Sequence, residues 1–225
     1  MPYEVGERLN STPRPPGSVR ISLTGRSVLV IVDVQNDFLP GGALPVPDGD
    51  SVIGPLNKYI SLFTGSGLPV FATRDWHPRE HVSFNTRGGP WPPHCVQNTW
   101  GAEISSMLSL PSSARIIDKA FTPDRDSYSG FQETILDLEL RRLGARRLFI
   151  GGLATDYCVK ATVLDSIDLG FETVLLLDAV KGVDAHPGDS EKAVREMVLK
   201  GAIGVTLSDV LPYGEPNPSP RTRVS

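Results

Sequence analysis

The chain has 225 residues, of which 40% are hydrophobic and 21% charged, and its formal net charge is −4. This length and composition are typical of one globular α/β domain with a sizeable core. The small negative charge argues against a nucleic-acid partner and against binding to an anionic membrane surface. The longest apolar runs are strand-sized, so the sequence also predicts no membrane-spanning helix.

The ends of the chain and its cysteines indicate the compartment. Charged and proline-rich residues stand at the N-terminus, where a secretory signal needs an apolar region. Two cysteines, Cys95 and Cys158, are too few for a disulfide framework. We therefore expect the reducing cytoplasm, with both thiols free. Composition also divides the chain into an N-terminal extension (1–25), a folded domain (26–210) and a proline-rich tail (211–225).

Strand and helix patterns alternate along the middle of the chain. Apolar runs rich in β-branched residues predict buried strands at 28–33, 68–73, 114–117, 147–151, 173–178 and 204–207. Apolar residues at helical spacing predict helices at about 50–65, 130–143, 156–169 and 188–201. Gly144, Gly170 and Gly201 follow three of these helices, as left-handed C-caps require. The alternation predicts a three-layer α/β/α sandwich with a mainly parallel, roughly six-stranded sheet.

Sheets of this kind bind ligands at the carboxyl ends of their strands. Reactive residue types follow most of the predicted strands. They are Asp33, Asp75 with His77, Asp118 with Lys119, the segment 151–158, and Asp178.

Cys158 follows a Gly-Gly-Leu-Ala-Thr-Asp-Tyr turn that joins a strand to a helix. The partial positive charge of a helix N-terminus favours a thiolate, which is the nucleophile of a cysteine enzyme. A sharp turn into a helix also exposes consecutive backbone N–H groups, as an oxyanion hole requires. The alternative for any free cysteine is a small buried hydrophobic side chain, and we interpret Cys95 in that way.

Asp33 and Lys119 are candidates to assist this thiol. A half-shielded carboxylate at a strand end can have a raised pKa and act as general base and acid. Capping a turn is the more common role of an isolated aspartate, and we interpret Asp37 as structural. A lysine beside a thiol lowers the pKa of that thiol. Lysine side chains are mostly exposed, so apart from its place after a predicted strand Lys119 would be interpreted as a solvated surface residue.

Asp75, His77 and His94 form a candidate metal site. Imidazoles with one carboxylate suit zinc, iron or manganese, and three protein ligands leave coordination positions open. The spacing matches no zinc-finger or HExxH motif, so hydrogen-bonded loop histidines are the alternative. His81 is either a fourth ligand or a residue that orients the loop, and His186 is interpreted as structural.

Over residues 26–210 the chain resembles the nicotinamidases of the isochorismatase-like cysteine hydrolase superfamily. The resemblance rests on motifs in a fixed order, which are Val-Asp-Val-Gln-Asn-Asp-Phe with Asp33, Arg-Asp-Trp-His with Asp75 and His77, Trp-Pro-Pro-His-Cys with His94, Lys119, Tyr-Ser-Gly-Phe at 128–131, and Gly-Leu-Ala-Thr-Asp-Tyr-Cys-Val ending at 159. Superfamily members with other substrates generally lack the Asp-His-His set.

The resemblance implies a role for each of these residues. Cys158 is the nucleophile, Asp33 the general base and acid, and Lys119 the stabilising cation. The N–H groups of Ala154 and Cys158 form the oxyanion hole beside a cis Leu153–Ala154 peptide bond. Asp75, His77 and His94 hold one divalent metal ion, zinc before iron or manganese, which binds the ring nitrogen of the substrate. Pocket aromatics align with Phe38, Trp91 and Tyr128.

The implied reaction converts nicotinamide to nicotinic acid and ammonia through a thioester, in NAD salvage. Pyrazinamide and related azine carboxamides are further candidate substrates, and a homo-oligomer is left open. Three alternatives remain from the residues themselves. They are a cysteine amidase for a ureido or carbamoyl compound, an iron oxygenase with Asp75, His77 and His94 as its facial triad, and a binding module without catalysis.

Overall fold

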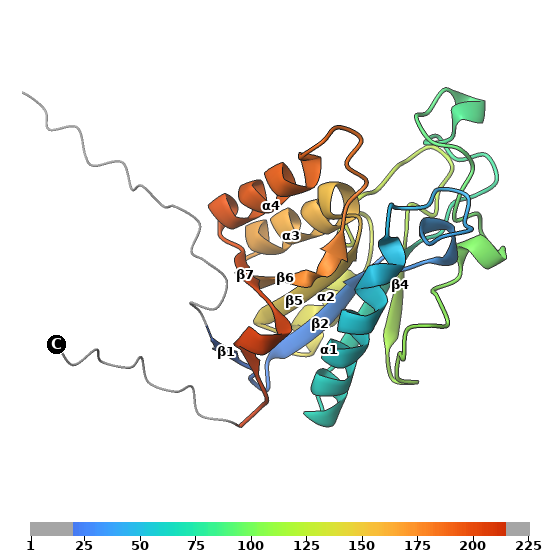
Figure 1. The fold of residues 1–225 in the computed structure, drawn as a ribbon. Helices are drawn as coiled ribbons and strands as arrows, with labels where there is room; N and C mark the ends of the chain where they lie inside the picture. The colour runs from blue at the N-terminus through green and yellow to red at the C-terminus, as the bar shows by residue number, and fades with distance from the viewer. Residues whose placement is uncertain (1–19, 215–225) are drawn as a thin grey trace, which may run out of the picture.

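A computed structural model of the chain describes residues 20–214. The predicted extension over 1–19 and the tail over 215–225 lie outside the described residues. The centre is a six-stranded sheet in the order β4-β3-β2-β5-β6-β7, with all neighbouring strands parallel (Figure 1). Its strands are β2 (Ser27–Val32), β3 (Val70–Asp75), β4 (Arg115–Lys119), β5 (Arg147–Leu153), β6 (Glu172–Lys181) and β7 (Ile203–Val205). All six predicted strands are therefore confirmed.

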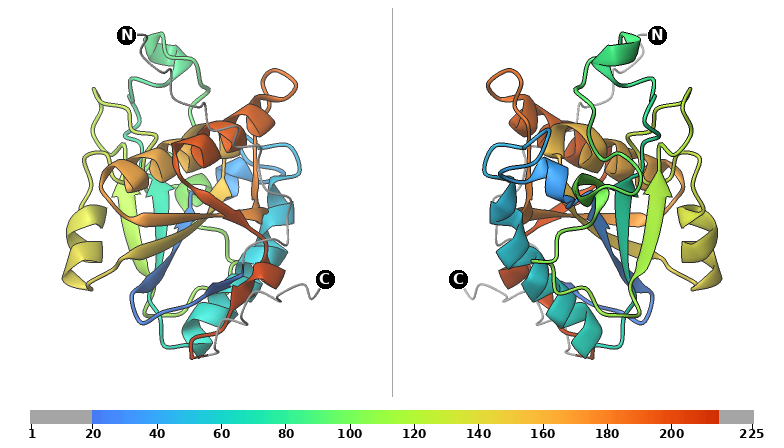
Figure 2. Two further views of the ribbon diagram at one scale, coloured as in Figure 1. Left: turned by 90° about the vertical axis from the view of Figure 1, so that its left-hand side faces the viewer. Right: turned by 90° about the vertical axis from the view of Figure 1, so that its right-hand side faces the viewer.

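Helices cover both faces of this sheet (Figure 2). Alternate side chains of β2 point to opposite faces, as the period of a strand requires. Leu29 and Ile31 pack in one hydrophobic core with α1 (Ile53–Gly65). Val28 and Val30 pack in a second core, which also contains side chains of α2 (Leu136–Arg142), α3 (Lys160–Asp168) and α4 (Asp189–Lys200). The three-layer α/β/α prediction is confirmed.

Two helices begin later than predicted. The N–H of Gly130 donates to Thr162 Oγ1 (2.9 Å), and the Thr134 hydroxyl donates to the Gly130 carbonyl, so the chain before α2 forms a loop. A π-helical turn, η5 (Thr155–Val159), precedes α3. The predicted C-caps are confirmed, because Gly144, Gly170 and Gly201 have φ angles of 68°, 84° and 127° after α2, α3 and α4. Short 3-10 turns are η1 (Asn36–Phe38), η2 (Gly49–Val52), η3 (Asn85–Arg87), η4 (Trp100–Ala102) and η6 (Leu207–Asp209).

A small second sheet joins the two ends of the described chain. Here β1 (Ile21–Ser22) pairs in parallel with β8 (Val210–Leu211). Arg147, at the start of β5, donates to the Ser22 carbonyl (2.9 Å), which places this sheet at the amino ends of the central strands. Residues from both predicted end segments thus take part in the fold. Within residues 20–214, no helix has the length and apolar character needed to cross a membrane.

Candidate active site

The carboxyl ends of four central strands bring the candidate residues together. Asp33 follows β2, Asp75 and Lys119 end β3 and β4, and Cys158 lies in the turn after β5. The chain runs outward from β2 to β4 and then returns to β5, so the strand order changes direction between β2 and β5. Asp33 and Cys158 therefore stand at the topological switch point, where folds of this class place their ligands.

Lys119 is the central charge of the site. Its Nζ lies 3.0 Å from Asp33 Oδ2, 2.5 Å from Asp75 Oδ1 and 3.4 Å from Cys158 Sγ. It also donates to the Ser127 carbonyl (3.0 Å), and its side chain is fully buried. Burial opposes the charge, but the two carboxylates outweigh this effect and raise the pKa of Lys119 well above its ordinary value. A buried ammonium ion therefore lies beside the thiol.

Asp33, the candidate general base, is buried and held by its neighbours. Thr73 donates its hydroxyl to Asp33 Oδ1 (2.6 Å). Asp33 Oδ2 forms a buried ion pair with Lys119 Nζ, at 3.0 Å. Burial raises the pKa of Asp33 to about 6, against the lowering effect of Lys119. The Asp33 carboxylate thus lies between a hydroxyl and an ammonium ion, with a pKa near enough to neutrality for proton transfer.

The resting state of Cys158 differs from the thiolate expected at a helix N-terminus. Burial raises the pKa of this thiol well above its ordinary value, and Lys119 only partly offsets the effect. The side chain is 6% exposed, and the helix α3 begins after it, at Lys160. The thiol is therefore protonated at rest, and a neighbouring base must remove its proton.

The turn that carries Cys158 is held by its own backbone. The Ala154 carbonyl accepts the N–H groups of Tyr157 and Val159, both at 3.0 Å. The Leu153–Ala154 peptide bond is cis, as the resemblance implied. Ala154 and Cys158 both line the pocket, so their part of the backbone faces the space where a substrate would lie.

Asp75, His77 and His94 also lie close together, with one potential ligand atom of each within 4.8 Å of the others. His77 Nδ1 contacts the His94 carbonyl (3.0 Å), and His94 Nδ1 contacts the Pro92 carbonyl (2.7 Å). A carbonyl only accepts, so each Nδ1 carries the proton and each Nε2 keeps a free lone pair. Burial lowers the pKa of His77 to about 4 and also lowers the pKa of His94. Lys119 keeps the pKa of Asp75 below its ordinary value, although burial opposes this.

His81 stands outside this set of ligands. Its Nδ1 contacts Ser83 Oγ (2.7 Å) and its Nε2 contacts the Arg125 carbonyl (2.8 Å), so both ring nitrogens are engaged. Its ring stacks on His77, with 4.3 Å between the centroids. Of the two roles considered for His81, this geometry favours orientation of the loop.

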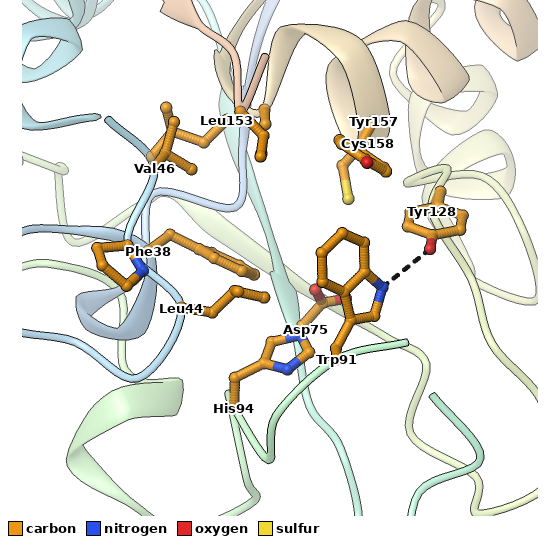
Figure 3. A pocket seen from close by; sticks show the side chains of 13 residues that line it. Phe38, Leu44, Val46, Asp75, Trp91, His94, Tyr128, Leu153, Tyr157 and Cys158 are labelled. Carbon is orange, nitrogen blue, oxygen red and sulfur yellow. Dashed lines mark hydrogen bonds between the residues drawn. The ribbon is translucent and has the colours of Figure 1, made fainter. Parts of the chain in front are cut away.

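An aromatic pocket opens in front of the thiol, which points toward Trp91 (Figure 3). Trp91 donates its indole N–H to the Tyr128 hydroxyl (3.1 Å), and Tyr157 packs against both rings. Phe38 lies on the opposite side, with its ring 5.6 Å from that of His94. The pocket thus combines a flat apolar lining with Cys158 at one end and the Asp75–His94 pair at another.

The motifs that meet in this pocket belong to a known family. The isochorismatase domain family matches residues 27–209. The chain belongs to the isochorismatase family. A nicotinamidase of Escherichia coli is 41% identical over 202 residues, which cover 80% of this chain and 95% of that relative.

Solved structures of the isochorismatase family agree with this placement. The pyrazinamidase of Pyrococcus horikoshii, in complex with zinc, is 52% identical, with a TM-score of 0.78 and 81% and 99% of the two chains covered. A protein of L. infantum in complex with nicotinate is 35% identical, with a TM-score of 0.77 and 86% and 100% covered.

Some pocket residues of this isochorismatase-family chain were not predicted. Leu44, Val46 and Val183 line the pocket from loops, and Tyr157 lines it from η5. Tyr157 stands next to Cys158 in the Gly-Leu-Ala-Thr-Asp-Tyr-Cys-Val motif, so the sequence could have indicated it. The aliphatic loop residues belong to no motif, and no sequence pattern indicates them. Two of the strand-end aspartates lie elsewhere, because Asp118 pairs with Arg74 and Asp178 accepts from Tyr59.

Proposed function

We propose that this protein is a nicotinamidase, a cysteine amidohydrolase that converts nicotinamide to nicotinic acid and ammonia through a thioester. The observation that carries the proposal is the contact of Lys119 with Asp33, Asp75 and Cys158 beneath an aromatic pocket. Relatives named nicotinamidase, and the nicotinate bound to the L. infantum protein, support this substrate class.

The chemistry follows from the protonated thiol. Asp33 removes the Cys158 proton, and the thiolate attacks the carboxamide carbon. Lys119 stabilises the developing negative charge, and the N–H groups of Ala154 and Cys158 bind the oxyanion. Loss of one such donor typically costs about 2.7–4 kcal/mol of transition-state stabilisation. Asp33 then gives the proton taken from Cys158 to the amide nitrogen, which leaves as ammonia as the C–N bond breaks, and Asp33 activates the water that hydrolyses the thioester.

Asp75, His77 and His94 would hold one divalent metal ion. The residues fit this task because both imidazoles are neutral, with Nε2 free, and the carboxylate is ionised. One carboxylate and two imidazoles suit zinc, and the P. horikoshii relative is a zinc complex. When bound, the metal supplies a Lewis-acidic anchor for the ring nitrogen of nicotinamide. Phe38 and Trp91 would hold the ring, so that its carboxamide points toward Cys158.

The geometry favours hydrolysis over the alternatives. An oxygenase would use Asp75, His77 and His94 but leave the thiol, its base and its ammonium ion without a purpose. A binding module would not require a buried Lys119 charge beside Cys158. An amidase for a ureido or carbamoyl substrate shares the same nucleophile, so a substrate assay is needed to separate it from a nicotinamidase.

The decisive assay measures ammonia release from nicotinamide, pyrazinamide and a ureido compound. We expect release from the two azine carboxamides, its loss after chelation and its recovery on addition of zinc. Alkylation with iodoacetamide, mapped by peptide mass spectrometry, should modify Cys158 and leave the core residue Cys95 as an internal control. Activity on the ureido compound alone would contradict the proposed substrate.

The bounds of the domain, the compartment and the oligomeric state are further proposals. The catalytic domain spans 26–210, between the extension and the tail. Both cysteines are free, which supports the reducing cytoplasm as the compartment and NAD salvage as the setting. A homo-oligomer stays a prediction, which sedimentation of the purified protein would test.

A further inference from the structure

The segment that follows β2 carries more than the general base. Its side chains at alternate positions, Asp33, Gln35 and Asp37, are all buried. Asp33 acts in the reaction proposed above. The side-chain hydrogen bonds of Gln35 and Asp37 reach neither Cys158 nor Lys119. Both side chains instead bind backbone groups beside the metal ligands.

Gln35 binds the main chain of Asp75 on both sides of that residue. Its Oε1 accepts the Asp75 N–H (2.8 Å), and its Nε2 donates to the carbonyls of Asp75 (2.8 Å) and Ala102 (3.0 Å). The side-chain amide thus acts as one more peptide unit at the end of the β2–β3 ladder. On its other edge, Asp75 pairs with Lys119 of β4, so Gln35 completes its fixation.

Asp37 binds the peptide unit that joins His94 to Cys95. Its Oδ2 accepts the Cys95 N–H (2.7 Å), while the carbonyl of the same unit, that of His94, accepts from His77 Nδ1 (3.0 Å). A carboxylate on the N–H polarises the peptide and strengthens its carbonyl as an acceptor. One buried charge thereby orients a peptide that fixes His94 and the tautomer of His77.

The Asp37 carboxylate is confined by neighbours on two sides. Its Oδ1 accepts the Ala43 N–H (3.0 Å), at the start of the loop that brings Leu44 into the pocket. On its other side lies Gly101 in η4, where an added Cβ would overlap the carboxylate. Any larger residue at position 101 would push Asp37 out of place.

We propose that Gln35 and Asp37 are positioning residues that align Asp75, His77 and His94 for metal binding, an inference that rests on the proposed metal centre. The segment from Asp33 to Phe38 then links the two halves of the site. Its first residue serves the thiol, the two alternate residues after it set the metal ligands, and Phe38 lines the pocket.

The test measures zinc affinity of the full-length protein by competition with a chromophoric chelator. Gln35→Met removes the amide and keeps the size of the side chain, and Asp37→Asn removes one acceptor oxygen. We expect each to bind zinc about 10- to 100-fold more weakly, as is typical for partners of metal ligands. Asn57→Leu is the matched control, because the Asn57 amide also bonds backbone groups, those of Met107 and Ser109, which are not beside the metal ligands, and the variant should keep wild-type affinity.

A second measurement separates alignment from general loosening of the site. The rate at which iodoacetamide alkylates Cys158 should stay unchanged in both variants. If Gln35→Met does not fold, Asp37→Asn and Gly101→Ala, which displaces Asp37 by steric overlap, test the same alignment. Wild-type zinc affinity in the folded variants, or an equal loss in Asn57→Leu, would overturn the inference. Absence of zinc binding by the wild-type protein would overturn the metal centre itself, whatever the ammonia assay gives.

Discussion

Lys119 Nζ lies 3.4 Å from the sulfur of Cys158 while it pairs with the carboxylates of Asp33 and Asp75. One buried cation therefore compensates two acids and faces the nucleophile. Removal of either acid or of the cation unbalances all three groups, so the charge pattern of the site is a single unit.

Replacement of Lys119 by methionine should harm both activity and stability. The variant leaves two buried carboxylates without their counter-ion, a change that typically costs about 3–5 kcal/mol. Ammonia release should fall by about 10²–10³-fold, as for the loss of one electrostatic donor. Thermal denaturation and ammonia assays would measure the two effects. The control is Lys200→Met, since Lys200 forms an exposed pair with Asp168 (2.8 Å) and should change stability by less than about 1 kcal/mol.

Replacement of Cys158 by alanine should separate binding from chemistry. We expect turnover to fall by about 10⁶-fold, as for other catalytic nucleophiles. Titration calorimetry should still detect nicotinamide, because the aromatic lining and the metal ligands are untouched. Cys95→Ala removes the other thiol, which faces the core, and should retain turnover. Near-normal ammonia release by the Cys158 variant would exclude the thioester route.

The pH profile should report Asp33. Its pKa is raised to about 6 by burial, and only its ionised form accepts the thiol proton. The value of kcat/KM should therefore be constant at pH well above 6, be half-maximal near pH 6 and fall further as the pH drops. The Thr73 hydroxyl stabilises the ionised form, so Thr73→Val should move this limb to higher pH. A limb that stays in place would show that another group controls the profile.

Replacement of His94 by alanine should lower metal content and substrate binding together. Two protein ligands hold a divalent ion far less well than three, and the anchor for the ring is lost with it. Elemental analysis and the KM for nicotinamide are the measurements. His186→Ala is the control, because this imidazole is 87% exposed and does not line the pocket. Full metal occupancy in the His94 variant would remove His94 from the set of ligands.

The centre of the sheet could be predicted because β2, β3 and β5 are buried on both faces. Such strands are continuous apolar runs, and their carboxyl ends indicate where a site must lie. Asp33, Asp75, Lys119 and Cys158 all follow from this rule together with their motifs. His94, the third of the proposed metal ligands, lies in a loop, and only its motif indicated it.

Other features depend on contacts that no local pattern records. Leu44 reaches the pocket because its N–H bonds to the Asp37 carbonyl (2.9 Å), a link between loop residues. The protonated state of Cys158 arises from burial, which a helix-start pattern does not reveal. Asp37 was interpreted as structural, and its bond to the Cys95 N–H connects it to the proposed metal site.

The small sheet formed by β1 and β8 has a practical consequence. It brings both ends of the described chain to the amino ends of the central strands, while the pocket opens at their carboxyl ends. A short peptide that joined residues 20 and 214 would allow new ends to be cut in an exposed loop, giving a circular permutant with the pocket intact. Attachment of the folded part to a surface through residue 20 or residue 214 would likewise leave the pocket facing away from that surface, which suits the protein to an ammonia-detecting electrode.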